Sequence, residues 1–147
     1  MKVIFQFDDD MDEVSGFELG DIIITKGDLQ CTSLKRKPNQ SMMLFITIHA
    51  LLNQIKKMIE SRKNEIVIEG VDSSYLLKIT KTKNLYTVSD DKCMMKGIEQ
   101  TELLNSVYQA AKTIWNKYGE SIISDSVRYD FCNALKSFKE LLNAHSR

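Results

Sequence analysis

A short acidic stretch near the N-terminus gathers the side chains of this sequence that are best suited to chemistry. Asp8, Asp10 and Asp12 match the first, third and fifth positions of a calcium-binding loop, in which carboxylate oxygens are the preferred ligands. Such a loop also needs glycine at its sixth position and glutamate at its twelfth, where this chain has Glu13 and Leu19. We therefore predict no metal site and interpret the stretch as a solvated turn after a strand.

Histidine and cysteine, which carry much of the proton-transfer and nucleophilic chemistry of enzymes, are few and scattered. The sequence holds His49, His145, Cys31, Cys93 and Cys132. No CxxC pair indicates a zinc or redox site, and nothing in the sequence brings a cysteine to His49 as a nucleophilic pair would require. We expect buried or half-buried free thiols and a hydrogen-bonded His49 at the edge of a helix core. The common phosphate-binding, dinucleotide-binding, zinc-protease and serine-hydrolase motifs do not occur, so we predict no cofactor.

Charge is balanced over the whole chain but not along it. The 147 residues include 20 Lys and Arg against 20 Asp and Glu, which argues against a nucleic-acid binder, because phosphate affinity comes from excess positive charge. Residues 1–28, however, hold eight acidic residues and two lysines, a net of −6, and the remainder carries +6. The one tight basic run, Lys35-Arg36-Lys37, has no neighbouring aromatic residue, so we interpret it as the solvated edge of a loop.

Apolar runs in the sequence are short. The longest covers residues 42–46, far below the ~20 residues of a membrane-spanning helix. The N-terminal residues lack the long apolar stretch and cleavage site of a signal peptide. We therefore expect a cytoplasmic protein with no membrane partner, in a reducing compartment that keeps its thiols free.

The first part of the chain is predicted to form strands followed by one helix. Alternating apolar and polar residues indicate a strand at residues 2–7, and residues 17–25 and 29–34 are predicted to form two more strands around Lys26-Gly27-Asp28. Gly27 supplies the positive φ of a tight hairpin between the last two, and Ile4 interrupts the alternation of the first strand, so we expect that strand to be covered on both faces. Apolar residues at three- and four-residue steps then predict a helix from Met42 to about Arg62, with Ser41 as its N-cap.

The rest of the chain is predicted to form an antiparallel meander and two helices. Four strand-like segments with short polar turns occupy residues 65–97, and Gly97 closes them. Connectors this short require antiparallel neighbours, because a parallel return needs a crossover of about a dozen residues. Apolar faces at helical spacing follow at residues 104–118, ending at Gly119, and at residues 127–142. We predict a single α+β domain over residues 1–147, with a mainly antiparallel sheet packed by one central and two C-terminal helices.

These observations favour a small, non-catalytic protein-binding module, comparable in class to inhibitor or immunity proteins that mask a basic partner. An exposed group of carboxylates attracts a basic protein and speeds its association at low salt. The predicted partner-binding residues are Asp8, Asp9, Asp10, Asp12, Glu13, Glu18 and Asp21.

Two other functions compete with this prediction. An enzyme or small-ligand-binding protein would use a pocket between the helices and the sheet, near His49 or Cys132, and a deep pocket that holds His49 with an acid or a thiol would favour it. A homodimer would be joined through an exposed strand edge or through the final helix, and exposed apolar residues there would favour it.

Overall fold

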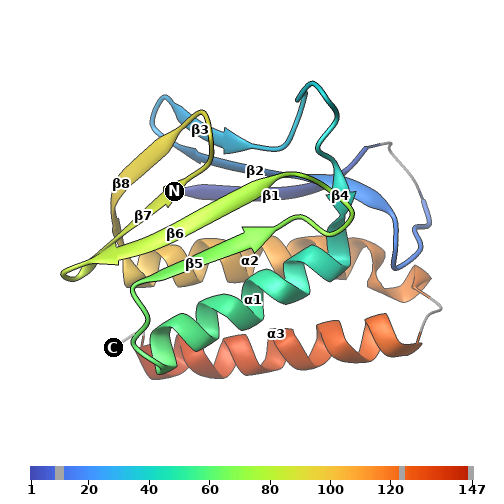
Figure 1. The fold of residues 1–147 in the computed structure, drawn as a ribbon. Coiled ribbons are helices and arrows are strands. Elements are labelled where there is room, and N and C mark those ends of the chain that lie inside the picture. The colour runs from blue at the N-terminus through green and yellow to red at the C-terminus, as the bar shows by residue number, and fades with distance from the viewer. Residues whose placement is uncertain (9–11, 123–124, 146–147) are drawn as a thin grey trace.

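The computed structural model describes residues 1–8, 12–122 and 125–145, in which four strands, a helix, four further strands and a run of helices follow one another (Figure 1). The strands are β1 (Lys2–Phe7), β2 (Leu19–Lys26), β3 (Leu29–Thr32), β4 (Met42–Met43), β5 (Glu65–Glu69), β6 (Leu76–Thr82), β7 (Leu85–Ser89) and β8 (Met94–Glu99). The helices are α1 (Leu44–Glu60), α2 (Gln100–Tyr118), the short 3₁₀ helix η1 (Gly119–Ser121) and α3 (Asp125–His145).

The described strands form two antiparallel sheets. In sheet A, β2 pairs with β1, β3 and β4, whereas sheet B is the meander β5-β6-β7-β8, in which each strand pairs with its neighbour in sequence. The helices lie together on one side of the two sheets (Figure 1). The predicted α+β class, with mainly antiparallel strands packed by one central and two C-terminal helices, is therefore confirmed.

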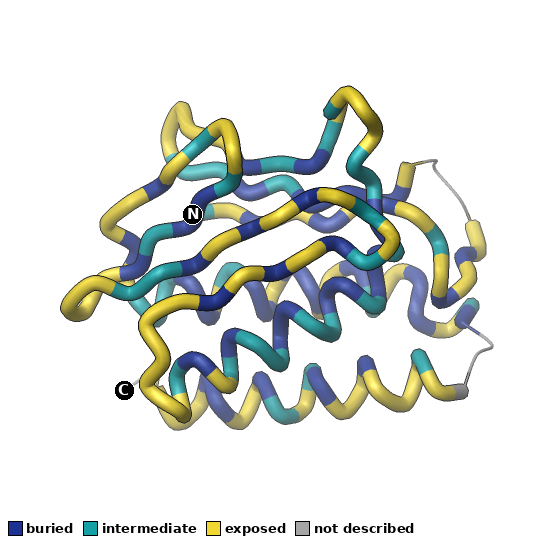
Figure 2. Tube along the Cα trace, in the orientation of Figure 1, coloured by how far each residue is buried: buried dark blue, intermediate teal, exposed yellow. Residues whose placement is uncertain are grey.

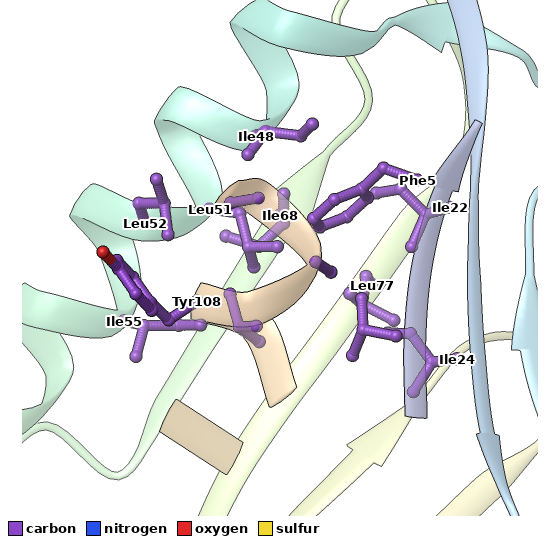
Figure 3. Packing of buried hydrophobic residues seen from close by; sticks show 14 of the residues in the cluster. Phe5, Ile22, Ile24, Ile48, Leu51, Leu52, Ile55, Ile68, Leu77 and Tyr108 are labelled. Atoms are coloured by element: carbon purple, nitrogen blue, oxygen red, sulfur yellow. The ribbon is translucent and has the colours of Figure 1, made fainter. Parts of the chain in front are cut away.

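A single hydrophobic cluster joins the two sheets to the helices. Figure 3 shows side chains of sheet A gathered with side chains of sheet B and of α1. The buried residues labelled there include Phe5, Ile22, Ile24, Ile48, Leu51, Ile68 and Leu77, none more than 6% exposed. Strict alternation of buried and exposed residues in β1 and β5 places one face of each strand in this core (Figure 2).

The start of α1 differs from the prediction. Ser41 does not cap the helix, since Met43 is the N-cap residue and no side chain caps it. Met42 and Met43 instead pair with β2 as the two-residue strand β4. The Ser41 hydroxyl lies 3.0 Å from a carboxyl oxygen of Asp8 and 3.0 Å from one of Asp21. The hydroxyl that was expected to cap the helix therefore contacts these two carboxyl groups instead.

Two details of the strands also differ. Gly97 does not close the meander but lies inside β8, with a φ of +73°, at a bulge where the pairing between β7 and β8 shifts. Ile4 is 37% exposed rather than covered, because β1 turns residues 3, 5 and 7 into the core and residues 2, 4 and 6 outward.

A group of aromatic rings connects the helices to sheet A. Phe45 lies at its centre, with its ring centroid 5.4 Å from that of Phe7, 5.5 Å from that of Trp115 and 5.2 Å from that of Phe131. Trp115 and Phe131 stack at 4.5 Å, and Tyr118 meets Phe7 edge-on at 5.0 Å. The aromatic residues of α2 that take part therefore pack against the core.

Candidate partner-binding site

The acidic segment belongs to the loop between β1 and β2, residues 8–18, which we call the acidic loop. Val14 anchors it, because its side chain is buried and its N–H donates to the Ser121 hydroxyl over 3.1 Å. Gly16 lies against Val127 of α3, and an added methyl group would lie only 3.0 Å from that side chain. The loop residues that follow the anchor are therefore held against η1 and the start of α3.

The described part of the acidic loop presents carboxyl groups and one aromatic ring to solvent. Asp8, Asp12 and Glu13 are exposed, and Glu18 is half-buried. Phe17 is 52% exposed. Asp9 and Asp10, which we also predicted to bind a partner, lie outside the described residues. Exposed aromatic side chains are frequent anchors of protein interfaces, so the loop combines charge with an apolar contact.

Asp21, the last of the predicted partner-binding residues, points into the protein. It is 2% exposed, and its carboxyl group accepts hydrogen bonds from the hydroxyls of Ser33 at 2.9 Å and Ser41 at 3.0 Å. Burial and the neighbouring carboxyl group of Asp8 raise the pKa of Asp21 above its ordinary value of 3.8. Asp21 therefore holds the base of the acidic loop and does not face a partner.

Replacing Asp21 with asparagine is expected to remove a pH-dependent contribution to stability. Because the pKa is raised in the folded state, the protonated carboxyl stabilises the fold below pH 3.8, and this stabilisation is lost as pH rises through the raised pKa. The free energy of unfolding of the wild type, measured with urea from about pH 4 to about pH 8, should therefore fall relative to that of Asp21→Asn. The exposed Asp12→Asn variant is the control, and parallel pH profiles for wild type and Asp21→Asn would contradict the expectation.

A buried ion pair connects the end of sheet A to the turn between β7 and β8. Arg36, expected at a solvated loop edge, is only 8% exposed in its side chain, and that expectation is wrong. Its guanidinium donates to Asp90 at 3.0 Å and to Asp91 at 2.6 Å, and lies over the ring of Tyr75. The Asp90 carboxylate also accepts from the Tyr75 hydroxyl and the Thr32 N–H, each at 3.0 Å. One carboxylate thus connects the two sheets.

The strand β1 lies at the edge of sheet A. Hydrogen bonds between antiparallel strands alternate, so every second residue turns its N–H and C=O toward the neighbouring strand. The Asp8 N–H donates over 3.3 Å to the carbonyl of Leu19, the first residue of β2, which indicates that the even-numbered residues of β1 turn toward β2. On the other side, the Met1 carbonyl accepts a hydrogen bond of 2.9 Å from the Ser106 hydroxyl of α2. The odd-numbered residues of β1 therefore turn their backbone groups toward α2.

Two adjoining cavities lie along this free edge of β1 beside α2. Their volumes are about 380 Å³ and 360 Å³, and both are lined by Phe5 and Thr113. Together they extend along residues 1–7 on one side and residues 106–118 on the other, and we call them the β1 groove. Volumes of this size are typical of binding clefts. The edge strand β1 thus lies beside an open groove.

A third cavity, of about 480 Å³, lies against sheet B. Its lining includes Lys78 and Ser89 of the central strands β6 and β7, and also Glu65 and Val67 of β5. Because β5 lies at an edge of sheet B, this cavity also borders a strand edge, although the backbone groups of β6 and β7 are paired on both sides. The β1 groove differs from this cavity in that its strand edge faces a helix, because β1 lines one side of the groove and α2 lines the other.

His49, the centre of the enzyme alternative, lies in a small cavity. Its Nε2 is 3.2 Å from the amide nitrogen of Asn53, which fits the expected hydrogen-bonded histidine at a core edge. The cavity lined by His49 and Asp130 has a volume of about 50 Å³, whereas ligand sites usually have volumes of several hundred cubic ångströms. Cys132 is exposed. The arrangement at His49 therefore offers an acid beside a histidine but no room for a substrate.

Comparisons with known proteins give no guide to function: no family model, curated protein or solved structure matches this chain. In the ranges that the structure describes, no helix has the length and apolarity to cross a bilayer. Across those same ranges, no three His, Cys, Asp or Glu side chains come together as a set of metal ligands.

Proposed function

We propose that this protein is a non-catalytic binding module that adds an extended segment of a basic partner protein to the edge of β1. The observation that carries the proposal is the free edge itself, where Val3, Phe5 and Phe7 turn their backbone groups toward the β1 groove. Strand addition to a sheet edge is a general mode of peptide recognition, in which main-chain hydrogen bonds give affinity and side-chain pockets give specificity.

The groove supplies both kinds of contact to an added strand. Each β1 residue that faces it provides one donor and one acceptor, and a hydrogen bond of this kind contributes about 0.5–1.5 kcal/mol. Ile4 from β1 and Ala110 from α2 add apolar surface to the lining. A partner segment with alternating apolar residues therefore suits the groove, because its side chains alternate between the two faces of the extended sheet.

The acidic loop begins where the groove ends. Asp8 directly follows Phe7, and the carboxyl groups of Asp12 and Glu13 are exposed farther along the loop. These groups complement basic residues that flank the added strand, which favours a basic partner and raises the association rate at low salt. Phe17 adds an exposed aromatic contact on the same loop.

A variant that fills the groove is expected to abolish strand addition. Thr113 lines both cavities, is exposed, and donates its hydroxyl to the Gln109 carbonyl of its own helix, so Thr113→Trp fills the groove with no loss to the core. Extended peptides selected on the wild type from a random displayed library should bind Thr113→Trp at least tenfold more weakly. Asn116→Trp, on the same helix but outside both cavities, is the matched control and should bind as the wild type does.

Amide exchange gives a second readout of the same experiment. Bound peptide should slow exchange at the N–H groups of Val3, Phe5 and Phe7, which face the groove. Neutralising the loop with Asp12→Asn and Glu13→Gln should slow association at low salt and leave dissociation unchanged. Peptides that bind Thr113→Trp as tightly as wild type would contradict the proposal. So would dimers of the wild type that Thr113→Trp dissociates, because the edge would then serve a second copy.

A further inference from the structure

Cys31 and Cys93 come together at the junction of the two sheets. Cys31 lies on β3 of sheet A and is fully buried, whereas Cys93 lies in the turn before β8 of sheet B and is half-buried. The Cys31 Sγ is 3.7 Å from the Cys93 carbonyl oxygen and 3.8 Å from that of Val88. The two cysteines are 62 residues apart in sequence, so the contact depends on the tertiary fold.

The side chain of Asp90 binds the backbone beside both cysteines. One of its oxygens accepts the Cys93 N–H at 3.0 Å, and the other accepts the N–H of Thr32, the residue after Cys31, at 3.0 Å. The Asp90 N–H in turn donates to the Cys93 carbonyl over 2.9 Å. The backbones that carry the two thiols are therefore fixed relative to each other by one buried carboxylate.

We propose that Cys31 and Cys93 form a reversible disulfide that links sheet A to sheet B when the protein meets an oxidant of the peroxide class. The Cys93 thiolate attacks one peroxide oxygen, the O–O bond breaks, and the departing hydroxide takes up a proton to leave as water. The Cys31 sulfur then attacks the resulting sulfenic acid, its own proton leaves with the hydroxyl group as a second water, and the S–S bond forms. Two thiols and one hydrogen peroxide thus give one disulfide and two waters.

The surroundings of the two thiols set the order of these steps. Burial, the Asp90 carboxylate and the Cys93 thiol raise the pKa of Cys31 to about 12, so Cys31 stays protonated at neutral pH. Cys93 is the more accessible of the pair and therefore meets a dissolved oxidant first. Cys31 acts second, as the resolving thiol for a sulfenic acid that forms beside it.

The experiment uses the Cys132→Ser protein, because exposed Cys132 would otherwise react with oxidant and form intermolecular bonds. Treatment with hydrogen peroxide is expected to lower the intact mass by two hydrogen atoms and to remove both remaining titratable thiols. Peptide mapping should recover the Cys31–Cys93 cross-link. Because the bond closes a loop of 62 residues, Tm should rise by roughly 10 °C and return to its starting value with dithiothreitol.

A second variant separates this result from nonspecific oxidation. Cys93→Ser in the same background is expected to keep its Cys31 thiol titratable and to show no rise in Tm after peroxide. Addition of oxygen atoms to the Cys132→Ser protein, with Cys31 still titratable, would overturn the proposal. Cross-linked dimers in place of an internal bond would overturn it as well.

Discussion

The Asp90→Asn variant is expected to have a free energy of unfolding about 3–5 kcal/mol lower than that of the wild type, because it removes one member of a buried ion pair. The Asp90 side chain is fully buried, and its two oxygens accept five hydrogen bonds of 2.9–3.0 Å. The donors are Arg36, Tyr75, Thr32, Lys92 and Cys93. Asparagine keeps the shape but presents an amide group that donates, and it leaves the Arg36 charge buried with a weaker partner.

Urea unfolding followed by the fluorescence of Trp115, the one tryptophan of the chain, measures this loss. The matched control is Asp91→Asn. Asp91 also binds Arg36, at 2.6 Å, but the Asp91 side chain is 68% exposed. The unfolding midpoint of Asp91→Asn should therefore stay close to that of the wild type. Equal decreases in the free energy of unfolding of Asp90→Asn and Asp91→Asn would show that the burial of Asp90 has no special role.

The Phe45→Ala variant is also expected to have a free energy of unfolding about 3–5 kcal/mol lower than that of the wild type, through a different mechanism. Phe45 is fully buried and contacts the rings of Phe7, Trp115 and Phe131, which come from three separate elements. Truncation at this point removes apolar burial and leaves a cavity among rings that cannot all move to fill it. The aromatic pairs add to the loss, since each is worth about 0.5–1.5 kcal/mol beyond its buried area.

Tyr129→Ala is the control for this second variant, because Tyr129 is aromatic, lies on α3 and is 69% exposed. The urea midpoint of Tyr129→Ala should change by less than about a fifth of the change in the urea midpoint of Phe45→Ala. Circular dichroism at the wavelength of aromatic signals should also change for Phe45→Ala. A small loss at Phe45 together with an unchanged spectrum would mean that the helices are held to sheet A by other contacts.

The strands and helices could be predicted from the sequence wherever neighbouring residues decide the structure. The meander of sheet B follows from short polar turns, since connectors of a few residues permit only antiparallel neighbours. The hairpin of β2 and β3 follows from Gly27, whose φ is +59°. The buried stripe of α1 follows from apolar residues at helical spacing.

Contacts between distant residues account for the differences. Ser41 has the residue type of a helix cap, but its hydroxyl binds Asp21, which is 20 residues away and buried. Arg36 lies in a basic run, but its guanidinium binds Asp90, 54 residues away. A local pattern cannot reveal partners at such separations, because only the tertiary fold brings them together.

The candidate site shows the same division. The position of the acidic loop could be predicted from the run of aspartates, although Asp21 belongs to the interior. The β1 groove could not be predicted from the sequence, because it depends on which strand lies at a sheet edge and which helix packs beside that strand. A strand edge was expected only as a general route to dimers. The alternation of β1 predicts a strand but does not tell whether it has one neighbour or two.

The position of α2 beside β1 also bears on solubility. A bare edge strand is a template for aggregation, since any unpaired strand can join it and extend the sheet. With α2 alongside, the space at this edge consists of two cavities of a few hundred cubic ångströms each, so we expect the helix to hinder the approach of a whole sheet. We therefore expect the helix that forms one wall of the groove to reduce association of copies of the protein through the β1 edge.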